Sequence, residues 1–282
     1  MQILDDYINR IKSLPPAPRI LPQLLGLLNQ DDVDAEQIVD LITFDPGLTA
    51  KLLQRCNSAA SGLSCPVHEL SQAVMLLGFN EIYRMVAVVI GEGMMGTAQR
   101  GYGIGTGELW EHSATAGLAA RVIAEKLGAE ADLAFTAGLL HDIGKLVLNS
   151  FLEGAYEPVL EQTGVSGKSF VETEKSILGV EHAEVGGRVL ARWRFPESLV
   201  QAVWHHHDPA QAHPWQQLAG YVYLADLIAH CLGHAGGFQS FAVRGRPEVL
   251  EMLEITPREI EGFILQTAAA VEEAHWIIPQ HP

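Results

Sequence analysis

Apolar residues recur at intervals of three and four along most of the chain, which is the spacing of one buried face of an α-helix. Strand-like alternation of apolar and polar residues is nearly absent, so the predicted fold class is all-α. The first two apolar runs comprise Ile3, Leu4, Tyr7, Ile8 and Ile11, then Leu21, Leu24, Leu25 and Leu28. Pro15, Pro16 and Pro18 lie between these runs. Because proline disrupts a helix interior, they predict a kink or a connection there.

Three polar residues predict where further helices begin. Asp34, with Gln37 three residues later, resembles a capping box. Asp45 followed by Pro46 is a helix cap followed by proline in the first turn. Asn80 predicts the cap of one more helix.

Seven glycines fall between positions 91 and 107, a density that disfavours a continuous helix because glycine has a low helix propensity. We therefore predict a domain boundary there, with an N-terminal helical bundle in residues 1–100 and a second helical domain in residues 101–282. A long surface loop inside a single domain is the alternative.

The composition is that of a folded protein with an acidic surface. Hydrophobic residues make up 48% of the 282 residues and charged residues 18%, which predicts a packed core rather than a disordered chain. The formal net charge of −16 repels phosphate backbones and anionic lipid at long range, so we expect no duplex nucleic acid and no membrane as partners. A local cationic pocket remains compatible with such a surface.

The cysteines and the N-terminus bear on location. Cys56, Cys65 and Cys231 form neither an even set nor a CxxC pair, which argues against disulfides and against a structural zinc knot. The N-terminus lacks the basic start and long apolar run of a secretory signal. No segment reaches the roughly 18 uncharged apolar residues of a membrane span. We therefore expect a cytoplasmic location.

Histidine is distributed unevenly along the chain. Of the twelve histidines, only His68 precedes the glycine-rich stretch. This imbalance indicates that the chemistry lies in the second domain.

The clearest candidate residues are His141, Asp142 and Lys145, which interrupt the apolar segment LAFTAGLLHDIGKLVL. A buried carboxylate needs a cation, hydrogen bonds or water, because burying it unpaired is costly. Adjacent side chains point about 100° apart on a helix, so His141 and Asp142 converge on one ion most easily near a helix end. Gly144 would permit the close backbone approach that such an end requires. The alternative is a helical salt bridge between Asp142 and Lys145, with His141 as an ordinary core residue.

Two further residues favour a metal site. Asp226 lies within YVYLADLIAH, where its alternative partner is His230 on the next turn, and His112 lies near the start of LWEHSATAGLAARVIAEKL, where capping or core packing is the alternative. Together with His141 and Asp142 they supply two imidazoles and two carboxylates. This mixed nitrogen and oxygen set suits Fe, Mn, Zn or Mg rather than a thiolate site.

Other histidines would extend the site to a second ion. The candidates are His182, in GVEHAEVGGRVL, and the triplet His205, His206 and His207. Three adjacent rings cannot all point to one place, so we expect one or two of the triplet to serve, with solvated loop histidines as the alternative. We expect the histidines at positions 213, 234, 275 and 281 to lie at the surface.

The arrangement H…HD…D, with HDIGK at its centre, resembles the HD superfamily of metal-dependent phosphohydrolases. Three N-terminal segments resemble one family within it, HDOD, the HD-related output domain of bacterial signalling proteins. These segments are LPPAP at 14–18, FDPGLTAKLLQRCNSA at 44–59 and AVMLLGFNEI at 73–82. The resemblance implies an HD-type helical domain after the N-terminal bundle, and a role as a regulatory output module.

HDOD proteins commonly lack the complete set of HD metal ligands. Here His112, His141, Asp142 and Asp226 all stand at positions that match it. The resemblance therefore implies that the metal-binding residues are retained.

His182, His206 and His207 match the further ligands of dinuclear members. Those members include cyclic di-GMP phosphodiesterases that carry a Gly-Tyr-Pro element, which AHPWQQLAGYVYLAD lacks. The missing element argues against cyclic di-GMP as the substrate.

The resemblance implies a cofactor of one or two divalent ions, with Fe or Mn favoured and Zn or Mg as alternatives. For a catalytic site, we expect Asp142 to bridge the ions and Lys145 to offset charge on phosphoryl oxygens. In the competing hypothesis the metal is structural and the chain is a signalling module. The expected partner is accordingly a signalling protein or a phosphoester ligand.

Overall fold

The computed structural model describes residues 18–28, 30, 34–58, 66–152, 170–234 and 246–274. These residues form helices and no strand, apart from one isolated bridge between Gln99 and Ile104, so the all-α prediction is confirmed. The predicted helix at 3–11 and the residues Pro15, Pro16, Cys65, His275 and His281 lie outside the described residues.

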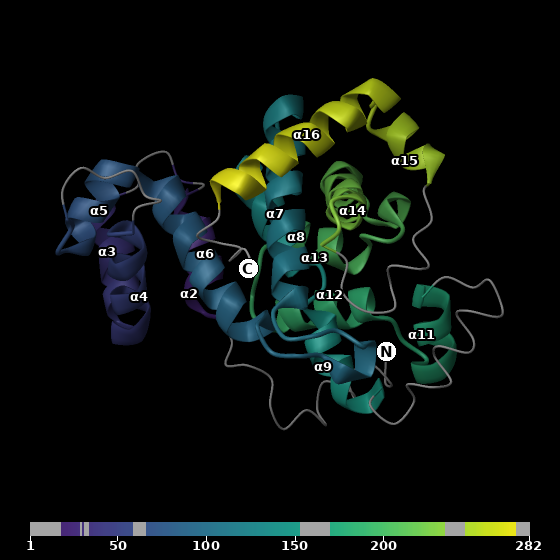
Figure 1. The fold of residues 1–282 in the computed structure, drawn as a ribbon, viewed down its shortest axis with the longest axis horizontal. Helices are drawn as coiled ribbons and strands as arrows, with labels where there is room; N and C mark the ends of the chain where they lie inside the picture. Colours follow the sequence, from purple (N-terminus) through teal and green to yellow (C-terminus); the bar gives the residue numbers. More distant parts are fainter. Residues whose placement is uncertain are drawn as a thin grey trace.

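The N-terminal helices are α2 (Ile20–Leu28), α3 (Ala35–Thr43), α4 (Pro46–Cys56), α5 (Leu70–Leu77) and α6 (Phe79–Met95). Helices α3, α4 and α5 form a group at one end of the molecule, and α6 runs from this group toward the remaining helices (Figure 1). Among the described residues no single helix is long and apolar enough to cross a membrane. Helices α5 and α6 meet that criterion only when counted together, across a bend of 119°.

Two of the predicted caps are confirmed and one is wrong. The Asp34 side chain accepts a hydrogen bond from the N–H of Glu36 and begins α3, and Asp45 accepts bonds from two N–H groups at the start of α4. Helix α6 instead begins at Phe79, directly after Gly78. Asn80 therefore lies inside the first turn, and its amide donates to Asp132 Oδ2 at 2.6 Å.

The glycine-rich stretch is helical for its first part, contrary to the propensity argument. Helix α6 continues through Gly91 and Gly93 to Met95. A Cβ atom on Gly91 would lie 2.7 Å from Trp110 Cζ3, so glycine is needed for α6 to pack closely on the next long helix. A single hydrophobic cluster includes Leu52 from before this stretch and Val185 from after it. The boundary near residue 100 stays a prediction.

The second part of the chain contains ten helical elements among the described residues. The 3-10 helix η2 (Arg100–Tyr102) precedes them. The ten are α7 (Glu108–Leu127), α8 (Ala131–Leu140), α9 (Gly144–Leu152), α11 (Phe170–Leu178), α12 (His182–Arg192), α13 (Glu197–Trp204), the 3-10 helix η3 (Pro209–Gln211), α14 (Gln216–Cys231), α15 (Pro247–Met252) and α16 (Pro257–Glu273). Helix α7 packs on α8 and α14, and α16 crosses α7 on the outside (Figure 1). The candidate site lies where α7, α12, α14 and the turns after α8 and α13 meet.

Candidate metal centre

His141 and Asp142 lie in the turn between α8, which ends at Leu140, and α9, which begins at Gly144. A Cβ atom on Gly144 would lie 1.9 Å from the carbonyl oxygen of His182. Only glycine therefore allows the start of α9 to lie against the start of α12, and this contact brings His182 beside Asp142. The expectation that His141 and Asp142 lie at a helix end, with a close approach at Gly144, is confirmed.

The first histidine group joins α7 and α14 to this turn. His112 Nε2 lies 3.2 Å from His141 Nε2 and 3.1 Å from Asp226 Oδ1. His230 Nε2 lies 3.3 Å from the same Asp226 oxygen. The helical pairing of Asp226 with His230 therefore forms, but it forms as part of the group. We name these four residues, His112, His141, Asp226 and His230, the first group.

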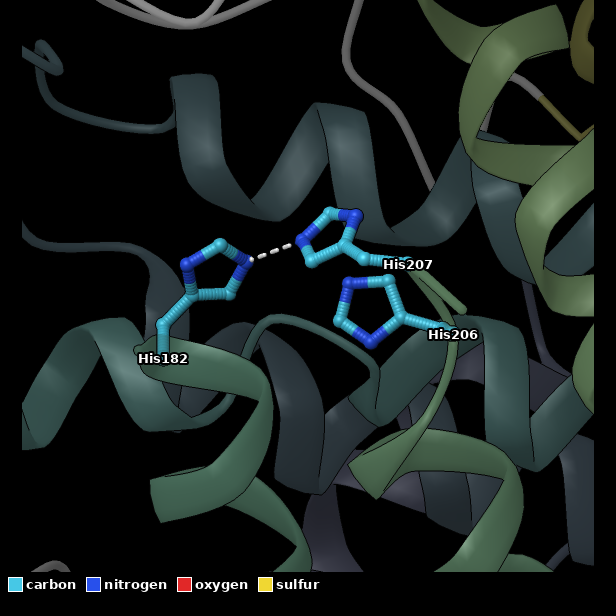
Figure 2. Close-up of side chains that lie close together, drawn as sticks. All are labelled: His182, His206 and His207. Carbon is cyan, nitrogen blue, oxygen red and sulfur yellow. Dashed lines mark hydrogen bonds between the residues drawn. The ribbon is translucent and has the colours of Figure 1, made fainter. Parts of the chain in front are cut away.

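The second histidine group comprises His182 at the start of α12 and His206 and His207 after α13. Figure 2 shows the rings of all three turned toward one another, with His207 Nε2 2.9 Å from His182 Nε2. His205 lies outside the group and stacks on Trp204. Two residues of the histidine triplet therefore reach the site, as its geometry requires.

Asp142 lies between the two groups. Its Oδ2 atom is 3.5 Å from His112 Nε2 and 3.4 Å from His141 Nε2, and its Oδ1 atom is 3.3 Å from His182 Nε2. The ammonium of Lys145 also bonds to Oδ2. The salt bridge and the histidine cluster are therefore not alternatives, because one carboxylate takes part in both.

Four histidine rings are oriented by hydrogen bonds from Nδ1, each of 2.7 Å. The acceptors are His234 O for His112, Gly138 O for His141, Val203 O for His206 and a Glu174 carboxylate oxygen for His182. Because these oxygens only accept, each Nδ1 carries the proton and the Nε2 of a neutral ring presents a lone pair to the site. Metal-binding histidines are commonly held in this way.

Three of these Nε2 atoms, those of His112, His141 and His206, leave a lone pair to be satisfied. The lone pairs of His112 and His141 face each other, so a cation or a proton is needed between them. His206 Nε2 is buried and has no hydrogen-bond partner in the part of the chain that the structure describes. The donor set therefore fits divalent metal ions bound by imidazole nitrogen and carboxylate oxygen.

The charges of the site differ between the two groups. Burial alone would lower the pKa of His141, but Asp142 and Asp226 outweigh it and raise that pKa to about 10. Burial lowers the pKa of His206 to about 3, helped by the nearby His141 and His182. Burial would raise the pKa of Asp142, yet His141 and Lys145 hold it well below its usual range. Without metal, the site thus combines ionised carboxylates with a protonated His141 and a neutral His206, and an ion bound by His141 would have to displace its proton.

Glu174 on α11 is a functional candidate that the sequence did not single out. It is fully buried, and it accepts hydrogen bonds from the backbone N–H and the Nδ1 of His182 at 2.8 and 2.7 Å. The hydroxyl of Tyr102 in η2 also bonds to it. Glu174 therefore fixes the ring of His182, and it connects that ring to the glycine-rich segment after α6.

The structure brings together all eight predicted site residues: His112, His141, Asp142, Lys145, His182, His206, His207 and Asp226. His213 is exposed, as expected. His234, also expected at the surface, is partly buried, and its backbone oxygen bonds to His112.

The sequence model of the HDOD domain family matches residues 14–209. An uncharacterised protein of Treponema pallidum is 26% identical over 232 residues, which are 79% of this chain and 44% of that protein. The chain spans less than half the length of the curated relatives that it matches.

Two solved structures share the fold. A candidate signal transduction protein from Marinobacter aquaeolei has a TM-score of 0.76 at 20% identity, over 98% of this chain and 64% of that one. A candidate phosphohydrolase from Shewanella amazonensis has a TM-score of 0.73 at 22% identity, over 98% of this chain and 96% of that one. With the family match covering more than half of its length, the chain belongs to the HDOD family.

Proposed function

We propose that this chain is a bacterial signal-transduction module whose buried centre binds two divalent metal ions. The observation that carries the proposal is the position of Asp142, whose two oxygens each lie beside a different histidine group. A bridging carboxylate between two sets of imidazoles is the arrangement of a dinuclear site. Membership of the HDOD family supports the signalling role.

Contacts between α6 and the helices of the site support a route for a signal. The hydroxyl groups of Tyr83 on α6 and Thr136 on α8 lie 2.6 Å apart, and Arg84 forms an ion pair with Asp132 at 2.8 Å. Gly91 packs against Trp110, which lies two residues before His112 on α7. A displacement of α6 would therefore move the helices that carry metal-binding residues of the first group.

The partner and location form part of the same proposal. The upstream partner would be a signalling protein that contacts the N-terminal helices. The location would be the bacterial cytoplasm, where the free thiols of Cys56 and Cys231 remain reduced.

Elemental analysis of protein purified without chelator tests the metal. Mixed nitrogen and oxygen ligands favour Fe or Mn, with Zn and Mg as further candidates. We expect His206→Ala to lower the metal content by about one ion per chain, because it removes a ligand of the second group only. His213→Ala, at an exposed histidine, is the matched control. Equal metal content in both variants would contradict two separate ion sites.

Phosphoester hydrolysis is a second candidate function, favoured by the buried Lys145 beside the bridging carboxylate. Divalent ions held there would activate a water molecule and offset phosphoryl charge. The ammonium of Lys145 keeps Asp142 ionised and adds positive charge next to it. The residues of the chain therefore suit a phosphoester with one or two negative charges.

The hydrolytic candidate is tested with cyclic dinucleotides, nucleotides and simple phosphodiesters, with Fe or Mn supplied. Turnover that His141→Ala abolishes and His213→Ala preserves would establish catalysis. Absence of turnover by metal-loaded protein on every substrate would leave the signalling role and reject the hydrolase.

A further inference from the structure

A pocket separate from the metal centre lies where the start of α2 meets the end of α12. Its volume is about 600 Å³. Its described lining residues are Arg19, Pro22, Gln23, Arg192, Trp193 and Arg194. Arg19 directly precedes α2, which contains Pro22 and Gln23, and Arg192 ends α12, which Trp193 and Arg194 directly follow. Three of the six are arginines, and none is a carboxylate.

Among the described residues, no side chain is paired with the three guanidinium groups. Arg19, Arg192 and Arg194 are exposed, and no hydrogen bond or ion pair joins them to another side chain within the described ranges. The chain has only 18 basic residues against 34 acidic ones. Three unpaired arginines around one pocket therefore concentrate positive charge on a molecule that is otherwise strongly acidic.

The backbone at Arg194 gives an independent reason to assign a role to its side chain. Its φ is 64°, in the left-handed region, and the hydrogen bonds Arg194 N to Ala191 O and Phe195 N to Leu190 O close a Schellman motif at the end of α12. Glycine is the residue that this position favours, since a side chain is strained there. Arg194 therefore adopts this conformation at a cost to stability.

We propose that this pocket binds a nucleotide that carries at least two phosphate groups. Guanidinium groups match phosphate oxygens in geometry and charge, and three of them exceed what a single phosphate would require. The volume lies in the range of small-molecule sites. Pro22 and Trp193 supply apolar wall for a base, and Gln23 supplies an amide that can donate and accept.

The position of the pocket makes its ligand a regulator. Helix α12 carries His182 at its first residue and Arg192 at its last, so the pocket and the metal centre are separated by about 15 Å along one helix. Arg19 precedes α2, in the N-terminal part of the chain. A nucleotide held by Arg19 and Arg192 links the N-terminal helices to the helix that positions His182.

Isothermal titration of the full chain with GTP, ATP, pyrophosphate and tripolyphosphate tests the proposal. The His141→Ala variant is titrated in parallel, so that nucleotide bound at the metal centre is recognised separately. We expect saturable binding of GTP or ATP that persists in His141→Ala and weakens about tenfold in Arg192→Ala, the loss expected for one charged hydrogen bond. Arg258→Ala, at an exposed arginine of α16, removes the same charge and should bind as the parent chain does.

Arg194→Gly separates ligand binding from folding. Because glycine relieves the left-handed backbone, the thermal midpoint should stay the same or rise while nucleotide affinity falls about tenfold. Unchanged affinity in both Arg192→Ala and Arg194→Gly would overturn the site. Tripolyphosphate that binds as tightly as GTP would overturn the assignment to a nucleotide. No heat from any of the four probes would overturn the proposal altogether.

Discussion

The helices α2 to α6 and the helices around the metal centre bury different kinds of side chain. Among the described residues up to position 98, no fully buried side chain is charged. Beyond that position, the buried side chains include His112, His141, Asp142, Lys145 and Glu174. The N-terminal helices are therefore held mainly by the hydrophobic effect, whereas the second part also depends on buried charges that compensate one another. A cation at the metal centre should thus stabilise the second part more than helices α3 and α4.

Removal of metal should give the largest difference between the two parts. With free metal at about 1,000 times its dissociation constant, binding stabilises the folded state by about 4 kcal/mol, and chelation removes this. Hydrogen exchange measured by mass spectrometry should show lost protection in α7, α12 and α13. Peptides from α3 and α4 should exchange as before. Equal loss of protection in both parts would contradict this difference between them.

A cavity in the N-terminal helices should give the opposite pattern. Leu52 on α4 is fully buried, so Leu52→Ala should lower the free energy of unfolding by about 2–5 kcal/mol while the metal content stays unchanged. Leu76→Ala, at a residue that is 61% exposed, is the matched control and should have little effect. Chemical denaturation and elemental analysis measure the two quantities. Metal lost with the Leu52 side chain would show that the two parts are not independent.

The orientation of His182 should have an intermediate effect. In Glu174→Gln, an amide replaces the carboxylate that accepts hydrogen bonds from His182. The variant should lower metal affinity by about 10–100-fold, while the first group still binds its ion. Titration with metal and a competing chelator measures the change. Glu251→Gln, at an exposed glutamate on α15, provides the control. Identical affinities in the two variants would remove the positioning role of Glu174.

Loss of a helix cap should have the smallest effect. Asp45→Ala removes the acceptor for two N–H groups at the start of α4, which should cost about 1 kcal/mol of stability. Asp40→Ala, on the exposed face of α3, should cost less. Metal content should be the same in both, as measured by elemental analysis. A larger loss of stability in the Asp40 variant would contradict the capping role.

The sequence predicted those features whose signals lie within a few residues of each other. The Asp45 and Pro46 pair is one example, because a cap and its N–H donors belong to the same turn. The predicted cap at Asn80 is wrong because Gly78 already marks the start of α6. The Asn80 amide instead bonds to Asp132, which is 52 residues away. The glycine at position 91 does not interrupt α6, contrary to the prediction, because it packs against Trp110, which lies on another helix.

The site shows the same limit at longer range. The residues of the two histidine groups were predicted except His230, which was expected only as an alternative partner of Asp226, and Gly144 indicated the helix end beside Asp142. The close approach of Gly144 to His182 depends on how α9 packs on α12, and no local sequence pattern specifies that packing. Glu174 gave no signal at all, because in FVETEKSIL it reads like the solvent-facing charges Glu172 and Lys175.

We propose that Asp142 joins two metal-binding histidine groups. Elemental analysis of the parent chain and of Asp142→Ala, both purified without chelator and compared with Asp40→Ala, tests it most directly. We predict about two divalent ions per chain in the parent and in Asp40→Ala, and almost none in Asp142→Ala, because both ions share this carboxylate. Full metal content in a folded Asp142→Ala variant, or a folded parent chain without metal, would contradict it.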